Sequence, residues 1–222
     1  GLKAKFNGDI QSIFVGKDLR NVNLDDINLD GQDLTGANLS GMDLRNIDLK
    51  NTIIRNTDLS NSNLEGKDLS GMDLRGINFS SANLKNVNFE HAIIGKTIQI
   101  VESSNGCSSD ELVLDLIKVF RCMGRTVENE SFRTNFQNAD LTNTRFGDTT
   151  PEKMQEITFA DFSGADFSNS NMIDVQCIGC NFKNTVFNGA MLENVMFYKA
   201  NFNNAKMENF DFDLIWFQDS TF

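Results

Sequence analysis

The sequence predicts a solenoid, in which a short repeat turns the chain back over itself many times, and three observations predict it. First, a large apolar residue recurs at every fifth position from Phe14 to Ile94 without a failure. Second, five matches neither the helical period of about 3.6 nor the strand period of about two, so the chain must turn within every repeat. Third, Gly, Asn, Asp or Ser usually follows two residues after the apolar position, where such residues form turns at little cost.

Each repeat is built around this apolar residue, which we call the central residue. The residue before it is Asp or Asn from Asp18 to Asn88, with Ile53 as the exception. The residue two before it is often Ala, Val, Ile or Met. A single repeat of this size cannot bury a core, so the repeats must stack on one another.

The pattern resembles the pentapeptide-repeat family, whose consensus is Ala-Asp/Asn-Leu-x-x. The segments that match it directly are Ala37-Asn38-Leu39, Ala82-Asn83-Leu84, Ala139-Asp140-Leu141, Ala165-Asp166-Phe167 and Ala200-Asn201-Phe202. The resemblance implies an all-β fold, a right-handed quadrilateral parallel β-helix with four repeats per coil. It also implies that the central residue and the residue two before it point inward, and that residues 20 apart lie above one another.

Two interruptions divide the repeat into blocks of one continuous solenoid domain. Residues 1–95 form the first block, and 96–131 form an insertion with a helix predicted at about 109–123, because Ser108 and Glu111 make a capping box before an apolar run. Residues 132–222 form the second block, with a short insertion near 149–157 where Pro151 predicts about one turn of helix. Since the chain begins at Gly1 and stops inside a patterned segment, we expect it to be a fragment of a longer protein.

Composition and charge exclude several classes of protein. The chain has 222 residues and a net charge of -11, which argues against direct binding to a nucleic-acid backbone. No apolar run approaches the roughly 20 residues of a membrane span, and the first ten residues lack the apolar stretch of a secretory signal. We therefore expect a soluble protein of the bacterial cytoplasm, or of the host cytosol if it is a secreted effector.

The residues that could carry chemistry are all explained by the repeat. Cys177 and Cys180 have the spacing of a zinc or redox pair, but both occupy inward positions, which predicts buried, unpaired thiols that serve as small apolar side chains. His91 occupies a turn position. Asn replaces Asp freely before the central residue, whereas a catalytic carboxylate cannot be exchanged for an amide. The sequence therefore predicts no catalytic residue, no metal site and no cofactor.

Two groups of apolar residues occupy outward positions. Ile13, Ile53 and Ile93 form one group, which could seat the inserted helix or the N-terminal segment, or bind a partner. In the other group, Met196 and Trp216 share a column 20 residues apart, and exposed aromatic and Met side chains are typical of interface cores. The candidate protein-binding residues are Trp216, Tyr198, Met196, Met191 and Ile178. The alternative is that the inserted helix or missing chain covers them.

These observations favour a non-catalytic scaffold or protein–protein interaction domain, with a protein partner of unknown identity and a monomeric or weakly dimeric state. The family resemblance extends to the β-helix that recruits substrates in HECT-like ubiquitin-ligase effectors secreted by enteric bacteria. It extends also to quinolone-resistance proteins, DNA-like acidic rods that bind type II topoisomerases and dimerise through a C-terminal helix. The alternative function is therefore a DNA mimic, although the acidic residues here are spread along the chain and no C-terminal helix is predicted.

Overall fold

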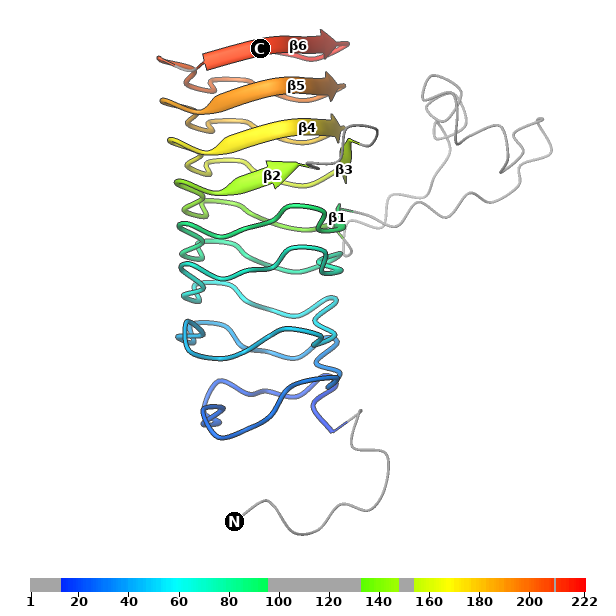
Figure 1. The fold of residues 1–222 in the computed structure, drawn as a ribbon, viewed down its shortest axis with the longest axis vertical. Coiled ribbons are helices and arrows are strands. Elements are labelled where there is room, and N and C mark those ends of the chain that lie inside the picture. The colour runs from blue at the N-terminus through cyan, green and yellow to red at the C-terminus, as the bar shows by residue number, and fades with distance from the viewer. Residues whose placement is uncertain (1–12, 96–132, 148–153, 210) are drawn as a thin grey trace, which may run out of the picture. The chain divides into compact units, whose positions relative to one another are not determined.

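The fold was derived from a computed structural model, which describes residues 13–95, 133–147, 154–209 and 211–222. These residues form a stack of coils that is the predicted all-β quadrilateral parallel β-helix (Figure 1). The strands are β1 (Ile94–Gly95), β2 (Arg145–Gly147), β3 (Gln155–Thr158), β4 (Asn171–Ile178), β5 (Met191–Tyr198) and β6 (Asp211–Gln218). All pair in parallel, in the order β1-β3-β4-β5-β6, and β2 also pairs with β4. No helix occurs in the described residues, and the helices expected at about 109–123 and at Pro151 lie outside them.

Backbone hydrogen bonds between coils hold the stack together. The amide of Leu39 donates to Asp58 O at 2.8 Å, and the amide of Asp58 donates back to Ala37 O at 2.9 Å. Residues 20 apart are therefore neighbours in adjacent coils, as the four-repeat coil requires. Between successive repeats of one coil, the amide of Ala37 donates to Leu34 O at 2.9 Å and closes a corner. Asn56, with a φ of 56°, illustrates why Asn and Gly recur at the corners, since few other residues tolerate positive φ.

The central residues form the core of the solenoid. Those of the first block are mostly Leu and those of the second mostly Phe, and nearly all are fully buried. Ring stacks connect one coil to the next, with centroids 4.8 Å apart for Phe136 and Phe162 and 5.1 Å apart for Phe162 and Phe182. Phe79 stacks on Phe136 at 5.1 Å, so the coils continue in register across the first insertion.

The second interruption is shorter than the sequence predicts. Residues 155–157, expected within the insertion near 149–157, belong to β3, in which Ile157 is a buried central residue paired with Cys177. This repeat lacks the usual Asp or Asn and has Gln155 at the inward position. The Gln155 side chain is buried, accepts from the Gly147 amide, and donates to Phe89 O and Ala92 O at 2.9 Å each. Its amide thus satisfies backbone groups that the repeat would otherwise leave unpaired.

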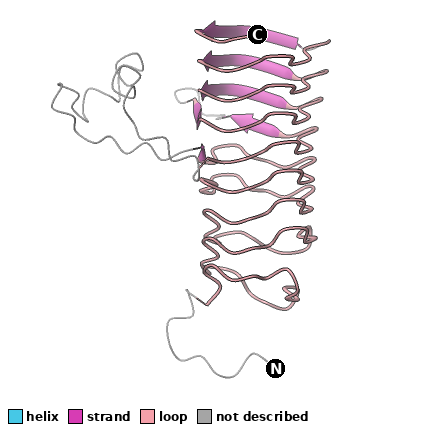
Figure 2. Cartoon of the chain, turned by 180° about the vertical axis from the view of Figure 1, so that it is seen from behind, coloured by secondary structure: helices cyan, strands magenta, loops and turns pink. Residues whose placement is uncertain are grey.

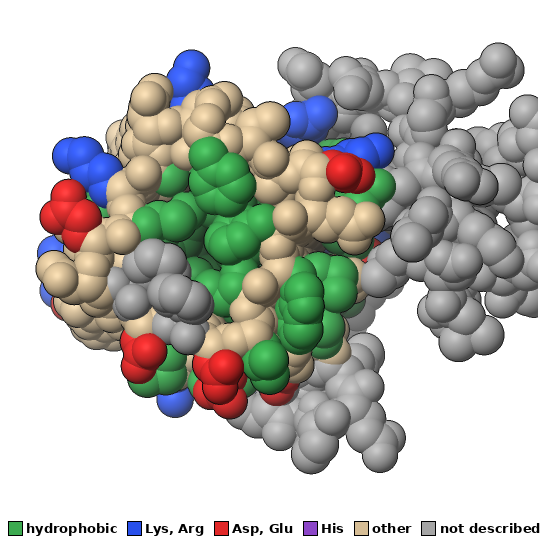
Figure 3. Space-filling model, turned by 90° about the horizontal axis from the view of Figure 1, so that it is seen from above, with side chains coloured by type: hydrophobic (Ala, Val, Ile, Leu, Met, Phe, Trp, Pro, Cys, Tyr) green, Lys and Arg blue, Asp and Glu red, His purple; other side chains and the backbone are tan. Residues whose placement is uncertain are grey.

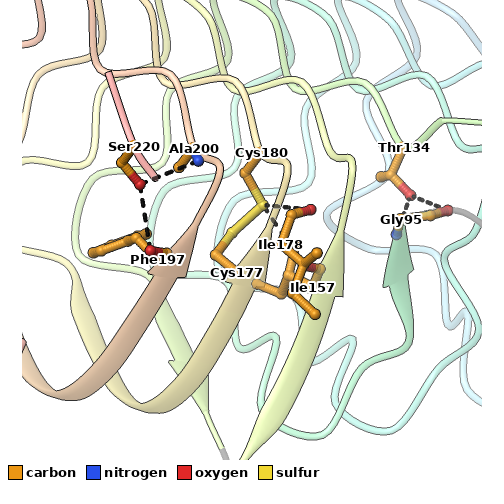
Figure 4. The surroundings of a disulfide bond; sticks show 9 residues. All are labelled: Gly95, Thr134, Ile157, Cys177, Ile178, Cys180, Phe197, Ala200 and Ser220. Atoms are coloured by element: carbon orange, nitrogen blue, oxygen red, sulfur yellow. Dashed lines mark hydrogen bonds between the residues drawn. A yellow bond between two sulfur atoms is a disulfide. The ribbon is translucent and has the colours of Figure 1, made fainter. Parts of the chain in front are cut away.

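The cysteine pair also differs from the prediction. Cys177 and Cys180 are buried as expected, but a disulfide joins them, which corrects the prediction of unpaired thiols (Figure 4). Their Cα atoms are 6.0 Å apart, because both side chains point into the same corner of the coil. In other coils, this inward position is occupied by Thr134 and Ser220, whose hydroxyls bond to backbone groups nearby (Figure 4).

Candidate protein-binding surface

One side of the solenoid carries the second halves of β4, β5 and β6, and we call it the Trp face. Its central residues include Ile94, Ile157, Cys177, Phe197 and Phe217, which pair in succession from coil to coil. Around each of them, the residues directly before and after point outward. Figure 2 shows the strands from behind, and the long ones lie in the coils toward the C-terminal end.

The structure brings three of the five candidate residues together on the Trp face. Met196 pairs with Trp216 in adjacent strands, and Tyr198 follows on the same strand as Met196. Trp216 is 46% exposed, whereas Met196 and Tyr198 are half-buried. Gln176 donates to the Met196 sulfur at 3.4 Å, and the Lys199 ammonium lies 5.2 Å from the Tyr198 ring centroid. These contacts hold the apolar side chains in place beside solvent.

The other two candidates do not belong to this surface. Ile178 is only 1% exposed, so the expectation that it contacts a partner is wrong. It lies in the ladder between Thr158 and Tyr198, where neighbouring side chains at strand spacing cover a side chain of its size. Met191 is 44% exposed but pairs with Asn171 and Asp211, which places it on the neighbouring face.

The structure also joins two groups that the sequence keeps apart. Because Ile94 pairs with Ile157, the outward residue Ile93 lies directly below Glu156 and so in the same column as Met196 and Trp216. We call this column the axial stripe. From the first coil to the last it consists of Ile13, Asp33, Ile53, Asp73, Ile93, Glu156, Gln176, Met196 and Trp216. The two insertions hide this relation, because counting in fives fails across them.

The charged members of the axial stripe differ in their surroundings. Partial burial opposes ionisation of Asp73, but hydrogen bonds from Arg75 and the charges of Arg75 and Arg55 hold its pKa below the usual value. The Glu156 side chain is exposed, yet desolvation by its surroundings raises the pKa of its carboxyl. No ion pair to Glu156 is formed within the described chain. Glu156 is thus an acidic group without a counter-charge in the middle of the stripe.

Figure 3 views the last coil end-on. Hydrophobic side chains fill the middle of the coil, and a second hydrophobic group lies at its rim, near acidic side chains. Within the residues that the structure describes, no group of three or more His, Cys, Asp or Glu side chains could hold a metal ion, and no helix could cross a membrane.

Comparison with known proteins gives one family and several distant structures. The family model for pentapeptide repeats matches residues 12–51, 52–90, 157–189 and 176–213. No curated relative matches the chain.

Three solved structures illustrate the likeness. The plasmid-mediated fluoroquinolone resistance protein QnrB1 is 12% identical, covering 95% of this chain and 85% of its own, with a TM-score of 0.32. HetL, from the cyanobacterium Nostoc and involved in regulating heterocyst differentiation, is 16% identical over 93% of this chain and 83% of its own, with a TM-score of 0.28. A protein of the Arabidopsis thaliana thylakoid lumen is 18% identical over 79% and 77%, with a TM-score of 0.28. Scores of this size carry no functional argument.

Proposed function

Because this chain belongs to the pentapeptide repeat family, we propose that it is a non-catalytic scaffold that binds a partner protein through its Trp face. The supporting observation is the exposure of Trp216 beside Met196 and Tyr198 on a rigid ladder of strands. Trp and Tyr are the residues that most often dominate binding energy, and they do so best where the free protein already holds them in place.

The proposal includes the finer role of recruiting a substrate or partner for a bacterial effector of the HECT-like ligase type. In that class, which the chain resembles, the β-helix is the recruiting part. An exposed aromatic surface supports recruitment, because it supplies contact area without requiring a catalytic group on the coils.

The DNA-mimic alternative needs carboxylates that stay available to a basic partner. Several carboxylates here are instead held by arginines of their own repeat, at 2.7 Å for Asp18 with Arg20 and 2.7 Å for Asp43 with Arg45. Such pairs cancel charge locally and favour an apolar contact over a uniform negative surface.

The test is affinity capture followed by measurement with the purified partner. The wild-type chain, a Trp216→Ala/Tyr198→Ala variant and a Met191→Ala control serve as baits in bacterial and mammalian lysates, and mass spectrometry identifies the retained proteins. We expect the double variant to weaken binding by more than about 2 kcal/mol, with an almost unchanged melting temperature. The control removes a comparable exposed side chain from the neighbouring face and should bind normally.

Two results would overturn the proposal. A large drop in melting temperature of the double variant would mean that these residues serve packing. Recovery of a type II topoisomerase whose binding does not depend on Trp216 and Tyr198 would support the DNA-mimic function instead.

A further inference from the structure

Several exposed apolar side chains recur on one face of the solenoid along its length. Ile53 and Ile93 are 46% and 49% exposed, similar to Trp216, and all three belong to the axial stripe. Ile13 and its neighbour Val15 extend the same face to the first described coil. Exposed apolar side chains that recur on one face over distant coils call for an occupant that is long in the direction of the solenoid axis.

The dimensions of the stripe fit an α-helix. From Ile13 to Trp216 the stripe covers about eight coil steps of about 4.8 Å each, or about 38 Å. That is the length of about 26 helical residues. Ile13, Ile53 and Ile93 recur at every second coil, about 9.6 Å apart, and residues seven apart on a helix are about 10.5 Å apart. One face of an amphipathic helix can therefore meet successive apolar side chains.

The backbone chemistry of the face also favours a helix over an extended segment. The amide of Leu74 donates to Ile93 O and the amide of Ile53 donates to Gln32 O, both at 2.9 Å, so these backbone groups are already bonded between coils. An extended strand laid across them would find no partners for its own amides and carbonyls. A helix satisfies its backbone internally and presents only side chains.

The acidic charge of the stripe favours a basic helix over an acidic one. Its charged members, Asp33, Asp73 and Glu156, are all acidic, and Arg55 and Arg75 neutralise only Asp73. Lys or Arg beside the apolar residues of a helix would supply the missing counter-charge at Glu156, which is exposed on this face. A second copy of this chain, with a net charge of -11, would bring acidic groups against acidic groups.

We propose that the axial stripe binds a basic amphipathic α-helix of the partner protein, aligned with the solenoid axis. This inference rests on the proposed function and extends its contact surface from the last coils to the first. Trp216 and Met196 would anchor one end of the helix, and Ile53 and Ile93 would contact it further along.

Binding of synthetic peptides to the full chain tests the proposal. The probe is a labelled peptide of about 26 residues, with apolar residues along one helical face and Lys beside them. One control peptide replaces Lys by Glu, and another has the same composition with its apolar residues scattered around the helix. By fluorescence anisotropy, we expect both control peptides to bind at least about tenfold more weakly than the probe.

Two pairs of protein variants locate the contact. Ile53→Ser/Ile93→Ser should weaken probe binding at least about tenfold, whereas Met191→Ser/Leu214→Ser, which alters exposed apolar residues outside the stripe, should change it less than about twofold. Glu156→Gln should weaken binding of the Lys peptide, and Glu193→Gln, on the neighbouring face, should not. Circular dichroism verifies that all variants are folded.

Each contrary result has a distinct meaning. Suppose that Trp216→Ala/Tyr198→Ala abolishes partner capture but Ile53→Ser/Ile93→Ser changes neither capture nor peptide binding. The proposed function then holds, but the proposal that the axial stripe binds a helix is wrong. If none of these variants affects capture, the proposed function fails as well. If the probe peptide binds only after deletion of residues 97–131, the occupant of the stripe is this chain's own insertion and not a partner protein. A dimer in sedimentation analysis that Ile53→Ser/Ile93→Ser dissociates would assign it to a second copy.

Discussion

The coils before residue 96 and those after residue 132 share one period but use different contacts. The earlier coils have mainly Leu at their centres and are linked by isolated bridges, whereas the later coils have mainly Phe and the continuous strands β4, β5 and β6. At one corner of the earlier coils the Met72 amide donates to Leu69 O of the preceding repeat in the same coil, but the corresponding Val175 lies in a strand paired with β5. The period therefore determines the fold, while the side chains determine how strongly adjacent coils are bound.

The aromatic stacks give the later coils an additional source of stability. Phe162, Phe182 and Phe202 follow one another with nearly parallel rings, 5.1 Å and 4.9 Å between centroids. Aromatic pairs contribute about 0.5 to 1.5 kcal/mol beyond their buried area, and Leu columns lack this contribution. Since each coil contacts only its neighbours, we expect the two blocks to differ in local stability.

The largest effect on stability is expected when a charged side chain is placed in the core of the earlier or of the later coils. Leu44→Asp and Phe182→Asp should each cost several kcal/mol, because an unpaired carboxylate would replace a fully buried side chain. Far-UV circular dichroism reports on all coils, and fluorescence of the single Trp, Trp216, reports on the last ones. Leu44→Asp should lower the first signal while Trp216 remains native, and Phe182→Asp should alter both. A variant as stable as the wild type would contradict the register.

Removal of one ring from the stack sharpens the comparison. Phe162→Leu should cost about 1 to 3 kcal/mol, because it removes the stacking contacts with both Phe136 and Phe182. Leu59→Met, a substitution of similar volume in the earlier coils, should cost less than about 1.5 kcal/mol. Urea unfolding measures both free energies, and equal losses would show that stacking adds nothing to packing.

The buried hydroxyls should not distinguish the two blocks. Thr57 donates to Leu34 O at 3.0 Å and Thr185 donates to Phe162 O at 2.9 Å, the same bond in an earlier and a later coil. Thr57→Val and Thr185→Val should each lower the free energy of unfolding by about 1 kcal/mol. A clear difference between them in urea titrations would mean that this bond depends on the central residues around it.

The smallest expected effect is an opposite response to acid. Hydrogen bonds from Arg20 and Arg45 lower the pKa of Asp18 and Asp43 to about 2. A carboxyl whose pKa is lowered in the folded state stabilises the fold at pH values above its unfolded-state pKa, which is near 3.8. This stabilisation is lost as the pH falls through about 2. The earlier coils should therefore weaken between about pH 4 and pH 2.

The later coils contain a group of the opposite sign. Desolvation of the Glu156 carboxyl raises its pKa, so the folded state holds this proton more tightly than the unfolded chain does. The stabilisation of the fold by protonated Glu156 is present at low pH and is lost as the pH rises through the raised pKa of this group. On acidification the urea midpoint from circular dichroism should fall further than the midpoint from Trp216 fluorescence. Arg20→Gln/Arg45→Gln should reduce this divergence, and identical midpoints at every pH would contradict it.

Much of the fold could be predicted from the sequence because the repeat encodes it redundantly. A central residue such as Leu44 and a corner residue such as Asn56 recur many times, so a single exception such as Ile53 does not obscure the register. The same reasoning placed Met196 below Trp216 correctly, since no insertion separates them.

The remaining features depend on spatial relations that a repeat of five residues does not determine. Ile94 lies beneath Ile157, and only the folded chain reveals that their 63-residue separation corresponds to one coil. The repeat places Cys177 and Cys180 inside the coil but says nothing of the bond between them. Outward position likewise differs from exposure, as the burial of Ile178 demonstrates.

The direction of the hydrogen bonds between coils has a mechanical consequence. These bonds run along the stack, as from Leu39 to Asp58, so a force applied to the two end coils along the axis loads them one coil at a time. The coils should then peel off in sequence at low force, each releasing about 60 to 70 Å of extended chain. A force applied across the stack would instead shear many bonds together and meet a higher resistance. The solenoid is thus compliant along its axis and stiff across it.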